Sequence, residues 1–110
     1  MRFYITIGLC LFLFPFLISC KRPEYSTGAE VYEGECVKCH KLNGKGGTKG
    51  PELTYIFREK DEQYIRAYTQ DPRSMKPDGT MPPSKLSEHE MNLLIEFLKA
   101  KGLTAAQTQP

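Results

Sequence analysis

The stretch Cys36-Val37-Lys38-Cys39-His40 decides how the rest of this 110-residue sequence is interpreted. Residues three and four positions apart share one face of a helix, so the two thiols and the imidazole can meet a single flat ligand. The whole chain has only four cysteines and two histidines. Three of these six residues lie within five positions, which predicts a site at which three side chains hold one planar group.

This C-x-x-C-H spacing is typical of covalent haem attachment, in which the thiols add to the haem vinyl groups and His40 binds the iron. Two other chemistries use the same residues. A thioredoxin-like redox pair requires a βαβ context, and the sequence shows no convincing strand. A zinc site requires more ligands, and apart from Cys20 the one remaining candidate is His89. We expect His89 to be a solvated residue in the first turn of a helix.

The N-terminal stretch has the composition of an export signal. Residues 3–19 are almost all apolar, follow Arg2 and are interrupted by Pro15, which favours a signal peptide over residues 1–19 rather than a membrane span. Leu17-Ile18-Ser19-Cys20 resembles the bacterial lipoprotein signal, in which the cysteine becomes the lipidated first residue. We therefore expect Cys20 to carry a lipid, with residues 20–26 as a short tether. The protein would then lie on the periplasmic or other extracytoplasmic face of the bacterial cell envelope, anchored to a membrane.

Charge and cysteine usage exclude several classes of protein. The formal net charge is +2 and there is no dense tract of lysine and arginine, so nucleic acid is not an expected partner. Beyond residue 20 the chain has only Cys36 and Cys39, which rules out a disulfide framework. A domain this small commonly needs a cofactor to complete its core.

Helical patterns predict an all-α domain over residues 27–103. Thr27-Gly28-Ala29-Glu30 has the form of a capping box and predicts a helix that continues to about His40. Residues 62–70 predict a middle helix ended by Pro72. Ser87-Glu88-His89-Glu90 is a second capping box and begins a last helix to about Lys101, with Gly102 just past its end.

The connecting segments are expected to be irregular. Residues 41–50 are rich in glycine and lysine and predict a loop, and residues 53–57 predict one or two helical turns. Residues 72–83 contain four prolines and are expected to be extended. Residues 104–110 are expected to form a disordered tail.

On these features the sequence resembles the single-haem class I cytochromes c, in a bacterial lipoprotein form. The resemblance covers roughly residues 27–101. Gly28 and Tyr32 stand eight and four residues before Cys36, as the family's first-helix glycine and aromatic residue do. Leu94 and Phe97 resemble the last-helix residues that pack across that first helix. The resemblance implies a small helical domain wrapped around one covalently bound haem c and its iron, with Cys36 and Cys39 as thioethers.

The resemblance also implies roles for residues outside the C-x-x-C-H stretch. Gly50-Pro51-Glu52-Leu53 is similar to the segment whose proline carbonyl accepts a hydrogen bond from the ligand histidine, here His40. Met81, in Gly79-Thr80-Met81-Pro82-Pro83, matches the second axial ligand of the iron, with Met75 as the competing candidate. Tyr68 falls where many members have a tryptophan near a haem propionate. Tyr68 would either offer its hydroxyl there or simply pack within its helix.

With His40 and Met81 on both sides of the iron, no coordination position is left for a substrate. We therefore expect a non-enzymatic carrier of single electrons between respiratory redox partners, working as a monomer or as part of a complex. One alternative is a haem c electron-input subunit of a membrane oxidase or reductase complex. Others are a sensor or enzyme from which Met81 dissociates, and a thiol–disulfide oxidoreductase without haem. Lysines near the attachment stretch either steer an acidic partner or are simply solvated: Lys38, Lys41, Lys45 and Lys49.

Overall fold

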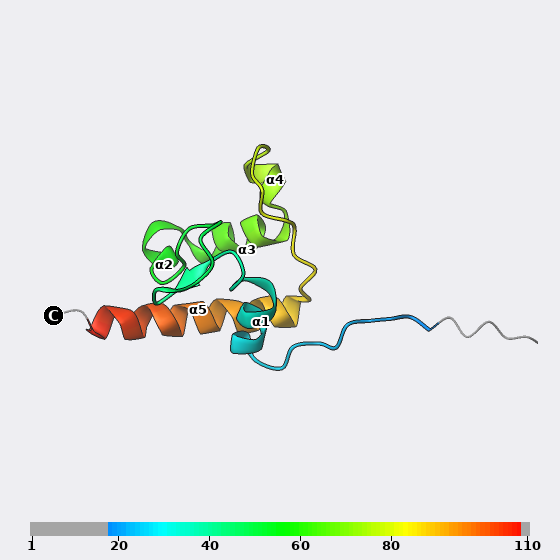
Figure 1. The fold of residues 1–110 in the computed structure, drawn as a ribbon, viewed down its shortest axis with the longest axis horizontal. Coiled ribbons are helices and arrows are strands. Elements are labelled where there is room, and N and C mark those ends of the chain that lie inside the picture. The colour runs from blue at the N-terminus through cyan, green and yellow to red at the C-terminus, as the bar shows by residue number, and fades with distance from the viewer. Residues whose placement is uncertain (1–17, 109–110) are drawn as a thin grey trace, which may run out of the picture.

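The computed structural model describes residues 18–108, which form a helical domain built on one long C-terminal helix (Figure 1). The predicted signal peptide lies outside these residues, except for Ile18 and Ser19. The elements follow in the order α1 (Gly28–Glu35), β1 (Lys41–Leu42), β2 (Lys45–Gly46), α2 (Ile56–Glu59), α3 (Glu62–Gln70), α4 (Pro72–Met75) and α5 (Glu88–Thr108). The predicted small all-α domain is confirmed, with a single short hairpin added. Within residues 18–108 no helix is both long and apolar enough to cross a membrane.

Helix α1 begins where its capping box predicts and packs across α5. The Thr27 hydroxyl accepts a hydrogen bond from the Glu30 backbone N–H, and the Glu30 carboxylate accepts one from the Thr27 N–H. At Gly28 the two helix backbones approach so closely that an added Cβ would collide with the Leu93 carbonyl and lie 2.5 Å from the Cβ of Phe97. This close approach fits the resemblance of Gly28 to the first-helix glycine of the class I cytochromes c, and glycine is the residue that permits it.

The core lies between α1 and α5 and continues under α3. Val31 and Tyr32 of α1 are buried against Leu94 and Leu98 of α5, and Leu53 and Phe97 pack on this cluster. The Tyr32 and Phe97 rings lie 5.9 Å apart. A second group follows on the same helix face and joins α5 to α3: Ile65, Met91 and Ile95. Helix α5 is therefore the element on which the others are assembled.

The loop after α1 contains a small hairpin that the sequence analysis did not predict. Strand β1 pairs antiparallel with β2, with Lys41 opposite Gly46 and Leu42 opposite Lys45. The two residues between them, Asn43 and Gly44, have positive φ angles of 51° and 77°. Asn-Gly is the residue pair that favours such a two-residue turn, because both residues tolerate the left-handed conformation.

Two helix boundaries in the second half of the chain differ from the sequence prediction. Residues 72–75 form one helical turn, α4, although an extended segment was expected from residue 72. Pro72 occupies the first turn of α4. A backbone N–H at that position has no acceptor within the helix, so its absence in proline costs no hydrogen bond. Helix α5 continues to Thr108 rather than ending near Lys101, so a disordered tail from residue 104 is wrong as far as Thr108.

Gly102 does not end helix α5, contrary to the prediction. It lies within α5 and is not among the glycines with positive φ. A Cβ at this position would lie 2.8 Å from the Thr54 carbonyl oxygen. Glycine is therefore placed here for close backbone approach between α5 and the segment before α2, and it does not end the helix.

Two leucines of α5 give a matched test of this core. The Leu98 side chain is 3% exposed and Leu103 is 66% exposed. We expect Leu98→Ala to lower the free energy of unfolding by about 2–5 kcal/mol, because it leaves a cavity between α1 and α5. Leu103→Ala, the control, is expected to change it by less than about 0.5 kcal/mol. Chemical denaturation of the haem-loaded protein measures both, and equal effects would contradict the placement of the core.

Candidate haem-binding site

The C-x-x-C-H stretch lies in a turn that follows α1, not within the helix as predicted. Cys36 is the C-cap of α1, and the turn is closed by hydrogen bonds from the Cys39 and His40 N–H groups to the Cys36 carbonyl, at 3.1 and 2.9 Å. The regular helical pattern is already lost at Val37, whose N–H donates to the Tyr32 carbonyl five residues back, at 3.0 Å. The downstream loop then closes over the turn: the N–H of Gly47 donates to the Val37 carbonyl and that of Gly50 to the Cys39 carbonyl, both at 2.8 Å. A helix running on past His40 would use these two carbonyls for the N–H groups of residues 41 and 43.

His40 is buried and its ring is fixed by the backbone of the following loop. Its Nδ1 lies 2.7 Å from the Pro51 carbonyl oxygen. A carbonyl can only accept a hydrogen bond, so Nδ1 carries the proton and, in the neutral ring, Nε2 keeps its lone pair for a metal. The hydrogen bond expected between His40 and Pro51 is present, and it selects the tautomer whose Nε2 is free to bind a metal.

The backbone at Gly50 forms the surface on which the His40 ring rests. A Cβ at Gly50 would lie 2.6 Å from Nδ1 and 2.9 Å from Nε2 of that ring. Any side chain at this position would therefore push the ring away from Pro51. On the other side, the buried Tyr32 hydroxyl donates to the His40 carbonyl oxygen at 2.9 Å, so His40 is held through both its ring and its backbone.

The two cysteines have the chemistry of attachment points rather than of a redox pair. Cys36 is buried, Cys39 is half-buried, and both are free thiols. Burial, with a smaller effect of the nearby Glu35, raises the pKa of the Cys36 thiol to about 12. Thiol–disulfide oxidoreductases depend instead on a thiol of lowered pKa. Two unpaired thiols beside an imidazole of fixed tautomer fit covalent haem c.

The zinc alternative has no support in the described part of the chain. No group of three or more His, Cys, Asp or Glu side chains within residues 18–108 is arranged to hold a metal ion. His89 is exposed on the first turn of α5, as expected for a solvated residue.

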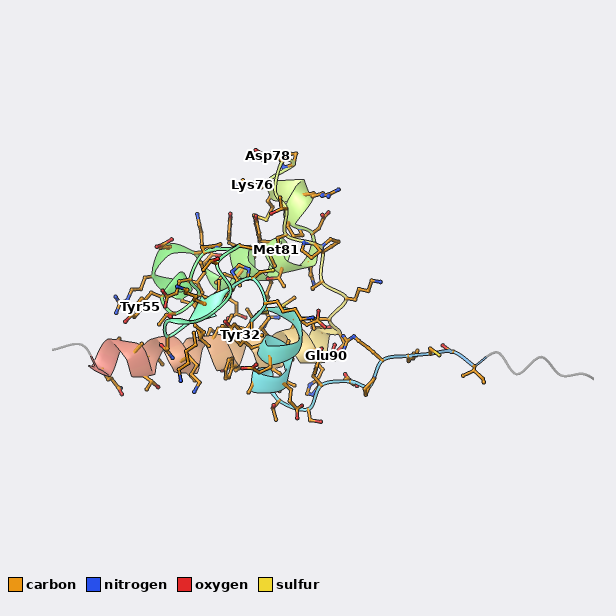
Figure 2. The ribbon with its side chains drawn as sticks, in the orientation of Figure 1. Tyr32, Tyr55, Lys76, Asp78, Met81 and Glu90 are labelled. Carbon is orange, nitrogen blue, oxygen red and sulfur yellow. The ribbon has the colours of Figure 1, made fainter. Side chains whose placement is uncertain are left out.

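Met81 lies on the segment that runs from α4 to the start of α5 (Figure 2). This segment is tied to α3, because the Ser84 N–H donates to the Thr69 carbonyl at 3.0 Å. Met81 is half-buried, whereas the competing Met75 ends α4 and is 40% exposed. Burial thus favours Met81 over Met75 as an iron ligand.

Tyr68 lies on α3, half-buried, with its ring stacked on that of Tyr64 at a centroid distance of 5.9 Å. Within residues 18–108 no hydrogen bond or ion pair joins Tyr68 or Met81 to His40. The structure therefore places Cys36, Cys39, His40 and Pro51 together, while the roles predicted for Met81 and Tyr68 stay hypotheses.

Two contacts that hold His40 in place were not predicted from the sequence. Gly50 was named only for its turn with Pro51, and Tyr32 only as a helix aromatic. A tyrosine four residues before Cys36 was a usable signal, since a buried hydroxyl needs a partner nearby. The expected lysines surround the turn: Lys38, Lys45 and Lys49 are exposed and Lys41 is half-buried.

Comparison with known proteins gives an independent result. Residues 25–101 match the sequence profile of the family described as Cytochrome c. The chain is 30% identical over 85 residues to cytochrome c oxidase subunit 2 of Alkalihalophilus pseudofirmus, covering 68% of this chain and 25% of that protein. It is 34% identical over 79 residues to a subunit of the nitric oxide reductase of Stutzerimonas stutzeri, covering 66% of this chain and 54% of that protein. The chain thus spans about a quarter and about half of these two relatives.

Replacement of Gly50 tests the support of His40. We expect Gly50→Ala to displace the ring and weaken its hydrogen bond to Pro51. A histidine that no longer donates from Nδ1 is a poorer electron donor to iron, so the reduction potential should rise by roughly 30–60 mV, a threefold to tenfold change for one electron. Redox titration of the haem-loaded protein measures the shift.

Gly44→Ala is the matched control, because a Cβ at Gly44 meets nothing within 4 Å. Its positive φ of 77° makes the change strained, so stability should fall by about 1–2 kcal/mol while the potential stays the same. An unchanged potential in Gly50→Ala, or an equal shift in both variants, would contradict the role of Gly50.

Proposed function

The chain belongs to the cytochrome c family, and we propose that it is a membrane-anchored carrier of single electrons between respiratory redox partners, using His40 and Met81 as axial ligands. As a member of this family it binds haem c covalently and takes part in electron transfer without being an enzyme in its own right. Haem c supplies an iron that changes between Fe(II) and Fe(III). The observation that carries the proposal is the 2.7 Å contact of His40 Nδ1 with the Pro51 carbonyl, which leaves Nε2 free to bind that iron.

The residues of the chain have separate tasks in this proposal. Cys36 and Cys39 would form the two thioethers, and His40 would bind the iron. Met81 would be the second iron ligand, a neutral thioether that favours Fe(II) and raises the reduction potential. Tyr68 is assigned a place near a propionate, where its hydroxyl would donate a hydrogen bond. The protein thus holds the iron in one coordination state and leaves no position for a substrate.

The anchor in this proposal is a lipid on Cys20. This cysteine is exposed and free, and it precedes the folded domain by only a few residues. In this proposal the lipid on Cys20 supplies the attachment to the membrane. The domain would lie on the extracytoplasmic face of a bacterial membrane, with residues 27–103 as the haem domain.

A second candidate is a haem c electron-input subunit of a membrane oxidase or reductase complex. It is favoured by the names of the two relatives, one a subunit of an oxidase and the other a subunit of a reductase. Both candidates assign the same roles to the residues around the haem. Stable co-purification with a membrane enzyme would favour the subunit, and fast exchange that depends on salt would favour the carrier.

Replacement of each methionine tests the closed coordination. We expect Met81→Ala to lower the reduction potential, remove the sulfur-to-iron charge-transfer band and allow the reduced protein to bind carbon monoxide. Met75→Ala is the control and should leave all three as in the wild type, because Met75 is exposed at the end of α4. Optical spectroscopy and redox titration measure these properties. Carbon monoxide binding to the wild type would instead favour a sensor or enzyme with an open iron site.

Replacement of Cys20 tests the anchor. We expect Cys20→Ser to move the haem-loaded protein from the membrane fraction to the soluble fraction, because a serine cannot be lipidated at that position. Cys10→Ser, within the predicted signal peptide, should leave it in the membrane fraction. Haem absorbance after fractionation reports the distribution, and a membrane-bound Cys20→Ser protein would show that the anchor lies elsewhere.

A further inference from the structure

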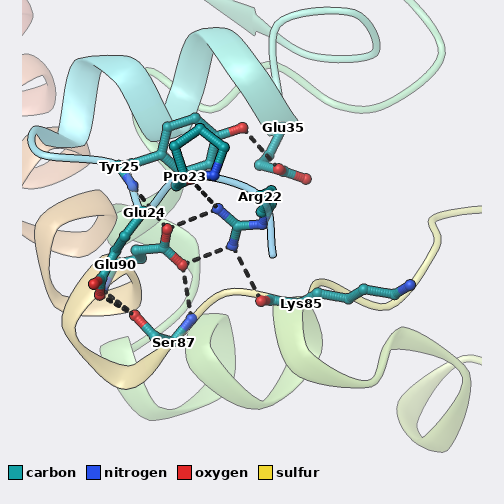
Figure 3. A network of polar contacts seen from close by, with 8 residues as sticks. All are labelled: Arg22, Pro23, Glu24, Tyr25, Glu35, Lys85, Ser87 and Glu90. Carbon is teal, nitrogen blue, oxygen red and sulfur yellow. Dashed lines mark hydrogen bonds and ion pairs between the residues drawn. The ribbon is translucent and has the colours of Figure 1, made fainter. Parts of the chain in front are cut away.

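The segment Arg22–Tyr25, named here the N-terminal strap, is fastened to the folded domain and is not a free tether (Figure 3). Arg22 donates from Nη1 and Nη2 to the two carboxylate oxygens of Glu90, at 2.8 and 2.7 Å. The backbone N–H of Tyr25 donates to the same carboxylate at 2.9 Å. A paired, two-pronged arginine–carboxylate contact of this kind is both strong and specific in direction.

The carboxylate that holds the strap belongs to a buried residue, because Glu90 is only 1% exposed. Its carboxylate also accepts the Ser87 N–H at 2.8 Å as part of the α5 capping box. The hydrogen bonds, first of all that from Arg22, hold the pKa of Glu90 at about 2, so the carboxylate is ionised at neutral pH. A buried anion that lost its cation would be left poorly compensated, which favours the docked strap over a detached one.

Further contacts spread the attachment over three parts of the domain. The Tyr25 hydroxyl donates to Glu35 at 2.9 Å, and its ring packs against α1 at Gly34, where an added Cβ would collide with it. The Ser87 hydroxyl donates to Glu24 at 3.0 Å. Arg22 also donates to the Lys85 carbonyl at 3.2 Å. The strap therefore joins α1, the start of α5 and the end of the segment between α4 and α5 that carries Met81.

The strap leaves very little free chain between Cys20 and Arg22. Two residues of fully extended chain span at most about 7 Å, compared with about 25 Å for the seven steps from Cys20 to Thr27. Arg22 lies outside residues 25–101, the part matched by the family profile. Figure 1 shows the N-terminal segment leaving the domain near the start of α5, whereas the C-terminal end of that helix lies at the opposite end.

We propose that the N-terminal strap fixes the orientation of the haem domain on the membrane, with the start of α5 facing the bilayer, so that the domain meets a membrane-embedded redox partner at a constant height and angle. This inference rests on the proposed lipid at Cys20. Helix α5 has 21 residues and is about 31 Å long, so its C-terminal end would be held away from the surface.

Haem dichroism in oriented bilayers tests this inference. The lipidated, haem-loaded full chain is reconstituted in phosphatidylcholine vesicles, the bilayers are stacked, and the linear dichroism of the haem absorption is recorded. We expect a clear dichroism for the wild type and its loss in Arg22→Ala. Arg66→Ala, which removes a half-buried pair with Glu62 on α3, is the matched control and should keep the wild-type dichroism.

A second variant covers the case in which Arg22→Ala fails to fold. Insertion of Gly-Ser-Gly-Ser between Cys20 and Lys21 leaves the strap and its contacts intact but lengthens the free chain, so it should also abolish the dichroism. Wild-type protein that is bound to vesicles without dichroism would overturn the inference, as would full dichroism in Arg22→Ala or in the insertion variant.

Vesicle flotation separates this inference from the proposed function. Failure of the wild type to float with the vesicles would overturn the lipid anchor, and the fixed orientation with it. Flotation with an intact haem spectrum but without dichroism would leave the anchored carrier standing and overturn the orientation alone.

Discussion

The hydrogen bond between the His40 ring and the Pro51 carbonyl is the constraint on which the rest of the structure depends. It requires the loop 41–50 to fold back over the C-x-x-C-H turn, and glycines make that return possible. Gly47 and Gly50 bring their N–H groups to carbonyls of the turn, and Gly50 leaves room for the ring itself. Helix α1 ends at Glu35, and the loop takes the Val37 and Cys39 carbonyls that a helix running past His40 would use.

Helices α1 and α5 hold that turn in place. Tyr32 of α1 connects the helices to the turn, since its ring packs with Phe97 of α5 and its hydroxyl donates to the His40 carbonyl. Gly28 lets α1 lie directly on α5. The apolar core of such a short chain is small, and a covalently bound haem would add apolar contact that the protein alone does not provide. Attachment chemistry and stability are thus two consequences of one arrangement.

Local signals in the sequence predicted the parts of the fold that depend on local contacts. Both capping boxes formed, at Thr27 and Ser87, and α3 has the bounds that its pattern and Pro72 indicated. The predictions failed where distant residues decide: the end of α1, and Gly102, which lies against Thr54 within α5. The contact of Arg22 with Glu90 joins residues 68 positions apart, and only the folded chain brings them together. At the site, the attachment stretch could be predicted from its spacing, whereas the contacts of Gly50 and Tyr32 with His40 could be found only in the structure.

The central claim is that Cys36 and Cys39 hold one haem covalently, with His40 fixed beside them by Pro51. The most direct measurement is an intact mass spectrum of the denatured full chain purified from membranes, combined with the absorption spectrum of the same sample. The account predicts a polypeptide that carries the mass of one haem, located on the peptide containing Cys36 and Cys39. A haem-free polypeptide in which these cysteines are free thiols or a disulfide would contradict it.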